Sequence, residues 1–148
     1  MRVERGFTLI ELLIVVAIIG IIAAIAVPNL MNAVDKGKQS KTMADIRAIA
    51  GAIEVYAVDN NTYPRVASYA ALIPFIQPIY IKSAPPGDGW NHPWVFTGDT
   101  NTGLDYTLTS LGKDGIPSAV TGGQTKDFDC DIIYANGQFF QWPSGAQT

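Results

Sequence analysis

The stretch FTLIELLIVVAIIGIIAAIAV, residues 7 to 27, decides the fold because its only charged side chain is Glu11. At about 1.5 Å per residue, a helix of this length spans the roughly 30 Å hydrocarbon core of a bilayer. A secretory signal peptide is the rival interpretation, but such a peptide ends at a small-residue cleavage site and the chain then changes character. Here the helical pattern continues. The stretch therefore predicts a membrane-spanning helix over residues 7–28.

A second, amphipathic pattern extends this helix beyond Pro28. Apolar side chains recur there at spacings of three and four residues, which places them on one helix face. These residues are Met43, Ile46, Ile49, Ala50, Ile53, Tyr56 and Ala57. Asn60, Asn61 and Pro64 then end the pattern. We expect one long helix whose second half, residues 29–63, carries an apolar face.

Pro28 lies inside the predicted helix. An interior proline removes a backbone donor and crowds the carbonyl group four residues earlier, that of Ala24. Gly20 is a second weak point. Two interpretations follow: a simple kink in a membrane helix, or a segment from Gly20 to Pro28 that loses helix locally when the helix packs among others.

The remaining residues, 64–148, predict a small globular region. Residues 65–83 contain short apolar pieces broken by prolines, which favours a helical turn and an extended stretch. Strands are expected at residues 94–96 and within DYTLTSLG, residues 105–112, and Asn136-Gly137 between two strand-forming runs is a strong hairpin signal. The fold class is therefore α+β, with three or four antiparallel strands packed on the apolar face of the long helix.

Composition argues against two function classes. Charged residues make up 16% of the chain and the net charge is -3. The chain thus lacks the excess of positive charge that is typical of proteins whose main partner is a nucleic acid. Ser110 precedes Leu111-Gly112 without the first glycine of a nucleophile elbow, and His92 is the only histidine. We expect a protein that is not an enzyme, with a single-pass membrane-anchored enzyme or binding module as the alternative from a different class.

The N-terminal residues RGFTLIELLIVVAIIGIIAAIAVP, 5 to 28, resemble the prepilin signature of type IV pilins and of type II secretion pseudopilins. Gly6 matches the glycine that ends a short charged leader, Phe7 the residue after the cut, and Glu11 the glutamate four residues later. The resemblance implies a pilin fold. It also implies that a prepilin peptidase removes residues 1–6 on the cytoplasmic side of the bacterial inner membrane and methylates the new amine of Phe7. The globular region would then lie in the periplasm.

Glu11 needs a physical explanation, because a charged side chain in a bilayer costs about 2.5 to 3.5 kcal/mol on insertion scales. Cleavage before Phe7 would create an ammonium group at membrane depth. A neighbouring copy, staggered along the helix axis, could bring that amine to Glu11. The hypothesis is that leader removal permits polymerisation by this pairing; the alternative is a carboxyl group that is simply protonated in lipid.

Residues 27–64 are similar to the major, G-type pseudopilin of type II secretion, as are DGWNHPW, residues 88–94, and YTLTSLGKDG, residues 106–115. The resemblance implies a subunit of a homo-oligomeric helical filament, the periplasmic pseudopilus. It implies as partners an inner-membrane assembly platform and minor pseudopilins. A subunit of a surface type IV pilus for adhesion, motility or DNA uptake is the alternative within the family. The single cysteine, Cys130, cannot form the disulfide usual in major type IV pilins.

An acidic loop is the one candidate metal site. Its carboxylates and backbone carbonyl groups are the oxygen ligands that Ca²⁺ prefers. The resemblance points to Asp114, Asp131 and the carbonyl group of Leu111, while Cys130 replaces an acidic residue of the family. Asp127 or Asp129 could take over that role. Two interpretations stay open at this point: a solvated acidic loop, or a calcium site.

Overall fold

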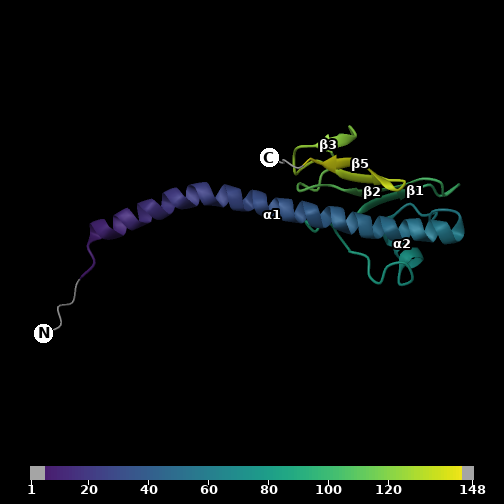
Figure 1. The fold of residues 1–148 in the computed structure, drawn as a ribbon, viewed down its shortest axis with the longest axis horizontal. Helices are drawn as coiled ribbons and strands as arrows, with labels where there is room; N and C mark the ends of the chain where they lie inside the picture. The colour runs from purple at the N-terminus through teal and green to yellow at the C-terminus, as the bar shows by residue number, and fades with distance from the viewer. Residues whose placement is uncertain (1–5, 145–148) are drawn as a thin grey trace. The chain divides into compact units, whose positions relative to one another are not determined.

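The computed structural model describes residues 6–144. The chain divides into two compact units, one ending at Val34 and one beginning at Asp35. Two helices and five strands make up the fold (Figure 1). They are α1 (Leu9–Asn60), α2 (Tyr69–Ile76), β1 (Val95–Gly98), β2 (Tyr106–Ser110), β3 (Gly123–Thr125), β4 (Ile132–Ala135) and β5 (Gln138–Pro143).

The long helix is confirmed: α1 runs unbroken for 52 residues and contains Pro28. It ends at Asn60, slightly before the expected boundary at residue 63, because Asn61 adopts a left-handed backbone conformation with φ 58°. An apolar window of α1 near the N-terminus has a mean hydropathy of 3.1, and none of that window is buried. By length and composition, this part of α1 is therefore able to cross a membrane.

The buried face of α1 begins earlier than the apolar pattern suggests. Alternate spacings of four and three residues connect Asp35, Gln39, Thr42, Ile46, Ile49 and Ile53, all of which are buried. The first three members of this face are polar, so a search for hydrophobic periodicity finds only the second half of it. The buried polar half is where α1 meets the loops described below.

The five strands form one sheet in the order β1-β2-β4-β5-β3. Neighbouring strands are antiparallel except for β3, which pairs with β5 in parallel. The sheet is thus mixed rather than wholly antiparallel, because β3 runs parallel to β5. The short sequence of β3, GQT, gave no signal for a strand. The hairpin between β4 and β5 is confirmed, with positive φ angles at Asn136 (46°) and Gly137 (88°).

One hydrophobic core joins α1, α2 and the sheet. Alternate residues of β2, namely Tyr106 and Leu108, are buried, whereas Thr107 is exposed. Ile46, Ile49 and Ile53 of α1 belong to the same cluster as Leu72 and Ile76 of α2. The sheet runs along the C-terminal part of α1 (Figure 1), so the loops at the Asp35 end of the sheet meet the polar half of the buried face.

Candidate functional sites

Glu11 lies in the first turn of α1 and is part of a capping box with Thr8. The Thr8 hydroxyl and backbone N–H donate to Glu11 Oε2 at 2.7 and 2.9 Å, and the Glu11 backbone N–H donates to Thr8 Oγ1 at 3.3 Å. Within the described residues, no basic side chain forms an ion pair with Glu11. In the single subunit, the carboxylate thus caps its own helix.

The two residues of the predicted cleavage site, Gly6 and Phe7, are exposed. Phe7 is 76% exposed, and a Cβ added to Gly6 would meet nothing within 4 Å. Large apolar side chains are exposed along the whole first unit, from Leu9 (85%) to Val34 (48%). Helix α1 in this unit therefore has an apolar surface on every side.

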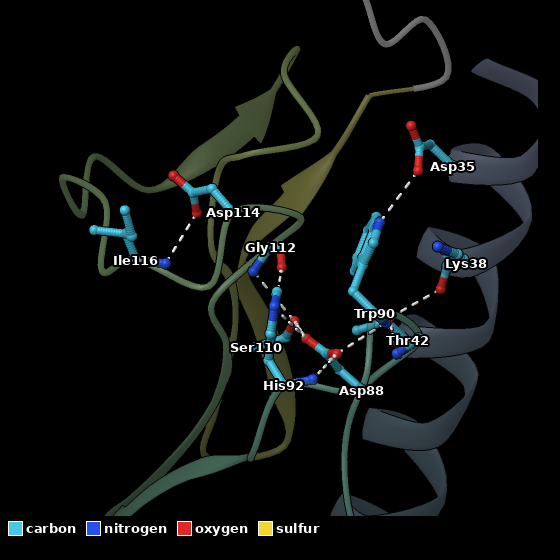
Figure 2. Close-up of polar contacts among 11 residues, drawn as sticks. Asp35, Lys38, Thr42, Asp88, Trp90, His92, Ser110, Gly112, Asp114 and Ile116 are labelled. Carbon is cyan, nitrogen blue, oxygen red and sulfur yellow. Dashed lines mark hydrogen bonds and ion pairs between the residues drawn. The ribbon is translucent and has the colours of Figure 1, made fainter. Parts of the chain in front are cut away.

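In the second unit, the turn at residues 87–93 docks on the polar half of the buried face of α1 (Figure 2). Its closest approach is at Gly89, whose backbone N–H donates to Thr42 Oγ1 at 2.9 Å, while the Thr42 hydroxyl donates to the carbonyl group of Lys38. A Cβ added to Gly89 would lie 2.2 Å from the Lys38 oxygen. Only glycine fits here.

Asp88 holds this turn together from inside and is 1% exposed. Its Oδ1 accepts the backbone N–H groups of Trp90 and His92, both at 2.9 Å, and its Oδ2 accepts the Ser110 hydroxyl at 2.6 Å. His92 Nδ1 instead lies 2.9 Å from the carbonyl oxygen of Gly112. Ser110, His92 and Asp88 are therefore close together but not in the order of a catalytic triad, since the serine donates to the aspartate and is fully buried.

Asp35 is the buried acidic residue where the second unit begins. Lys113 Nζ lies 2.9 Å from Asp35 Oδ2, and the Trp90 indole N–H donates to Asp35 Oδ1 at 3.3 Å. Burial alone would raise the pKa of Asp35, but the hydrogen bonds from Lys113 and Trp90 outweigh it and hold the pKa below its ordinary value. This cluster ties the loop after β2 to α1.

The predicted metal residues separate into two groups. Asp131 is 3% exposed, and its Oδ1 has no hydrogen-bond partner among the described residues. Burial raises the pKa of Asp131, and the nearby charge of Asp114 raises it further, although hydrogen bonds with Ser118 act in the opposite direction. Asp114 is exposed and accepts the Ile116 backbone N–H at 3.0 Å. Leu111 is half-buried at the start of the same loop.

Asp127 and Asp129 lie in a separate exposed turn before β4. Asp127 Oδ1 accepts the Asp129 backbone N–H at 3.1 Å. Within residues 6–144, no group of three or more histidine, cysteine, aspartate or glutamate side chains is arranged to hold a metal ion. The structure thus relates Asp114 to Asp131 but does not add Asp127 or Asp129 to that pair.

Trp94 and Cys130 take part in the packing of the globular unit and in none of the sites described above. Trp94 is buried in the core and its indole N–H donates to the Pro85 carbonyl group at 3.0 Å, so its role is packing. Cys130 is free and half-buried, and burial raises the pKa of its thiol. Sequence reasoning missed the capping role of Thr8, although the Thr-x-x-Glu spacing of Thr8 and Glu11 was the available signal. Asp35, Asp88 and Gly89 had no comparable local signal.

Comparisons with known proteins agree with these observations. A family model described as "Type II secretion system (T2SS), protein G" matches residues 29–132, and one described as "Prokaryotic N-terminal methylation motif" matches residues 1–27. The type II secretion system core protein G of Escherichia coli K12 is 36% identical, with 76% of this chain and 83% of that protein covered. The Pseudomonas aeruginosa protein of the same name is 37% identical, with 86% and 94% covered.

Among solved structures, the crystal structure of the major pseudopilin from the type 2 secretion system of enterohaemorrhagic Escherichia coli is similar. Its TM-score is 0.46 at 28% sequence identity, with 72% of this chain and 93% of that chain covered. The two family models together extend over both the apolar anchor and most of the globular unit. The chain therefore belongs to the protein G family of the type II secretion system, a family of structural pseudopilins and not of enzymes.

Proposed function

We propose that this protein is the repeating subunit of a periplasmic type II secretion pseudopilus. The observation that carries the proposal is the first unit: its apolar helix is exposed on all sides, and a methylation motif covers the same residues. An apolar helix of this length is stable in a bilayer or when surrounded by other helices, but not in water. The subunit would therefore wait in the inner membrane as a single-pass precursor and leave it by polymerising.

Polymerisation would begin with leader removal. A prepilin peptidase would cut between Gly6 and Phe7 and methylate the new amine, and the exposed positions of both residues are compatible with access by an enzyme. Lipid tails are as apolar as the helix, so packing and electrostatic pairing must favour the filament over dispersion in the membrane. Pairing of Glu11 with the Phe7 amine of another copy would supply such a preference, and the Thr8 contacts would hold Glu11 until then.

The partners of this function would be further copies of the chain, minor pseudopilins and an inner-membrane assembly platform. The similarity to core protein G from several bacteria supports a secretion pseudopilus. A type IV pilus subunit for adhesion, motility or DNA uptake is the second candidate, and no specific contact of the structure favours it. Pushing secreted proteins across the outer membrane would be the mechanical result of filament growth.

The test uses the full chain in a host that has the peptidase and the assembly machinery. Sheared filaments should contain a subunit that starts at a methylated Phe7, as determined by mass spectrometry. The Glu11→Ala variant should be cleaved but should form few filaments. Glu11→Gln is the matched control, since glutamine keeps the capping hydrogen bonds with Thr8 and removes only the charge. Glu11→Gln should therefore also form few filaments. If either variant assembles as the wild type does, the pairing mechanism is wrong; an uncleaved wild-type monomer would contradict the function itself.

We also propose that Asp114 and Asp131, with the Leu111 carbonyl group, bind Ca²⁺. A buried carboxylate oxygen that has no hydrogen-bond partner among the described residues, and that feels the charge of a second carboxylate, is the arrangement that a divalent cation would neutralise. The two carboxylates alone are too few for the six to eight oxygen ligands that Ca²⁺ takes, so backbone carbonyl groups and water would supply the rest. Bound calcium would fix the loop after β2 without taking part in any reaction.

Thermal unfolding of the full chain in detergent tests the calcium proposal. At a calcium concentration of about 100 times Kd, binding to the folded state adds about 2.7 kcal/mol of stability. We expect a higher midpoint for the wild type and no rise for Asp131→Asn. Without calcium, Asp131→Asn should be at least as stable as the wild type at neutral pH, because the raised pKa means that deprotonated Asp131 destabilises the fold. A wild-type midpoint that calcium does not move would support the solvated loop.

A further inference from the structure

A shallow groove lies between the middle of α1 and strand β5. It has a volume of about 260 Å³ and is lined by Met43, Arg47, Phe139 and Trp142. The guanidinium carbon of Arg47 lies 5.1 Å from the centroid of the Phe139 ring. Stacking on an aromatic ring holds an arginine side chain in place and leaves its N–H groups free to donate. The groove therefore combines apolar sides with one positioned cation.

Arg47 has no acidic partner within residues 6–144. The ion pairs there are Lys41–Asp45, His92–Asp88 and Lys113–Asp35. Arg47 is exposed at the groove, and its guanidinium N–H groups donate no hydrogen bond within the described residues. A guanidinium group held against a ring is suited to donate two parallel hydrogen bonds to a carboxylate. The groove is thus complementary to an acidic side chain from another molecule.

The chain itself carries a matching acidic surface, which we call the acidic turn, residues 127–130. Phe128 is 3% exposed and anchors this turn in the protein, whereas Asp127 and Asp129 on either side of it point to solvent. The Lys113 backbone N–H donates to the Phe128 carbonyl group at 2.9 Å, which fixes the turn. The carboxylate of Asp129 accepts no hydrogen bond within the described residues.

Lys113 does not neutralise the acidic turn. The charges of Asp127 and Asp129 both raise the pKa of Lys113, but its main partner is Asp35, which is 2.9 Å away. One ammonium group therefore faces three carboxylates. The acidic turn keeps a net negative charge that is available to a cation of another copy.

The two surfaces lie at different heights along α1. Lys113 connects the acidic turn to Asp35, and Arg47 lies twelve residues further along the helix, which is about 18 Å. A contact between two different patches on identical molecules is heterologous, and it repeats without closing unless a rotation brings the chain of copies back to its start. A displacement along α1 at each contact produces a filament. The acidic turn and the Arg47 groove are offset along α1, so a contact between them would displace each copy relative to the previous one.

We propose that the acidic turn of one copy docks on the Arg47 groove of the next, with Asp129 accepting from the Arg47 guanidinium and the turn covering Phe139 and Trp142. The proposal rests on the proposed filament function and assigns one of its contacts between globular units. It also gives Asp129 a role other than binding calcium.

Charge reversal tests the contact in the full chain, with sheared filament yield as the readout. Arg47→Glu and Asp129→Arg should each abolish most filaments, because like charges would then face each other across the contact. The Arg47→Glu/Asp129→Arg double variant should restore them. Lys82→Glu is the matched control for Arg47→Glu, since Lys82 is exposed and the substitution makes the same change in net charge. Thermal unfolding in detergent should give similar midpoints for all variants, which separates assembly from folding.

Three results would overturn the contact: filaments of Arg47→Glu at the yield of Lys82→Glu, filaments of Asp129→Arg at that yield, or a folded double variant that still does not assemble. The last result would assign Arg47 to a different partner, such as a minor subunit or secreted protein. A wild type that never forms filaments would instead contradict the proposed function, so the two failures are distinguishable.

Discussion

Gly89 shows at the scale of one residue how closely the globular unit is fitted to α1. We predict that Gly89→Ala lowers the free energy of unfolding by about 1–3 kcal/mol, because the added Cβ would overlap the Lys38 carbonyl oxygen, and backbone cannot easily move away. Gly51→Ala is the matched control: a Cβ there meets nothing within 4 Å, and alanine favours a helix interior by about 0.5–1 kcal/mol. Urea unfolding of both variants measures the difference. Equal midpoints would contradict the close approach.

Asp35 makes a second prediction at this scale, about pH. Its pKa is lowered in the folded protein, so its contribution to stability is complete above the unfolded-state pKa of about 3.9 and is lost as the pH falls toward the lower folded-state pKa. We therefore expect the wild type to lose more stability than Asp35→Asn when unfolding is compared at about pH 6 and about pH 3. If the wild type and Asp35→Asn lose equal amounts of unfolding free energy between the two pH values, the Asp35–Lys113 pair does not stabilise the fold.

At the scale of elements, the sequence predicted those parts whose signal is local. The length and apolar composition of α1 and the Asn136-Gly137 turn are properties of neighbouring residues, and both are confirmed. The parallel strand β3 was missed because its three residues have no alternating pattern, and its pairing with β5 depends on a distant part of the chain. The start of the buried face at Asp35 was missed because polar side chains are buried there by partners that the sequence does not reveal.

The continuous helix through Pro28 gives the prediction for an element. In the single subunit α1 does not lose its helical structure around this proline, although the proline cannot donate to the Ala24 carbonyl group. Pro28→Ala should therefore leave the fold of the subunit intact and raise the stability of α1. If residues 20–28 must lose helix when subunits pack, the same variant should form fewer or shorter filaments. Circular dichroism in detergent measures the helix content, and filament yield and length measure assembly. Normal filaments of Pro28→Ala would exclude the local loss of helix and leave the simple kink as the interpretation.

At the scale of the whole molecule, some functional residues were predicted from a local motif, whereas others were found only in the folded structure. Cleavage at Gly6 and Phe7 and the acidic residue Glu11 were predicted from one contiguous motif, which the family match also covers. The contacts of Asp35, Asp88 and Gly89 join α1 to the turn at residues 87–93, to β2 and to the loop after β2, and only the folded chain brings these segments together. Local patterns therefore revealed how the subunit is anchored, while the structure was needed to find how the globular unit is fastened to its helix.

One face of α1 in the second unit remains uncovered and has the character of a contact between copies. Its exposed residues recur at spacings of four and three and are small or apolar: Ala44, Ala48, Gly51, Val55 and Val58. Small side chains let another helix approach closely, so a bulky one should keep it away. We predict that Ala48→Leu keeps the unfolding midpoint of the wild type, since leucine forms helices nearly as well as alanine, but lowers filament yield. Ala70→Leu on the exposed side of α2 is the control for added apolar surface on a helix. Full assembly of Ala48→Leu would show that this face points away from the filament axis.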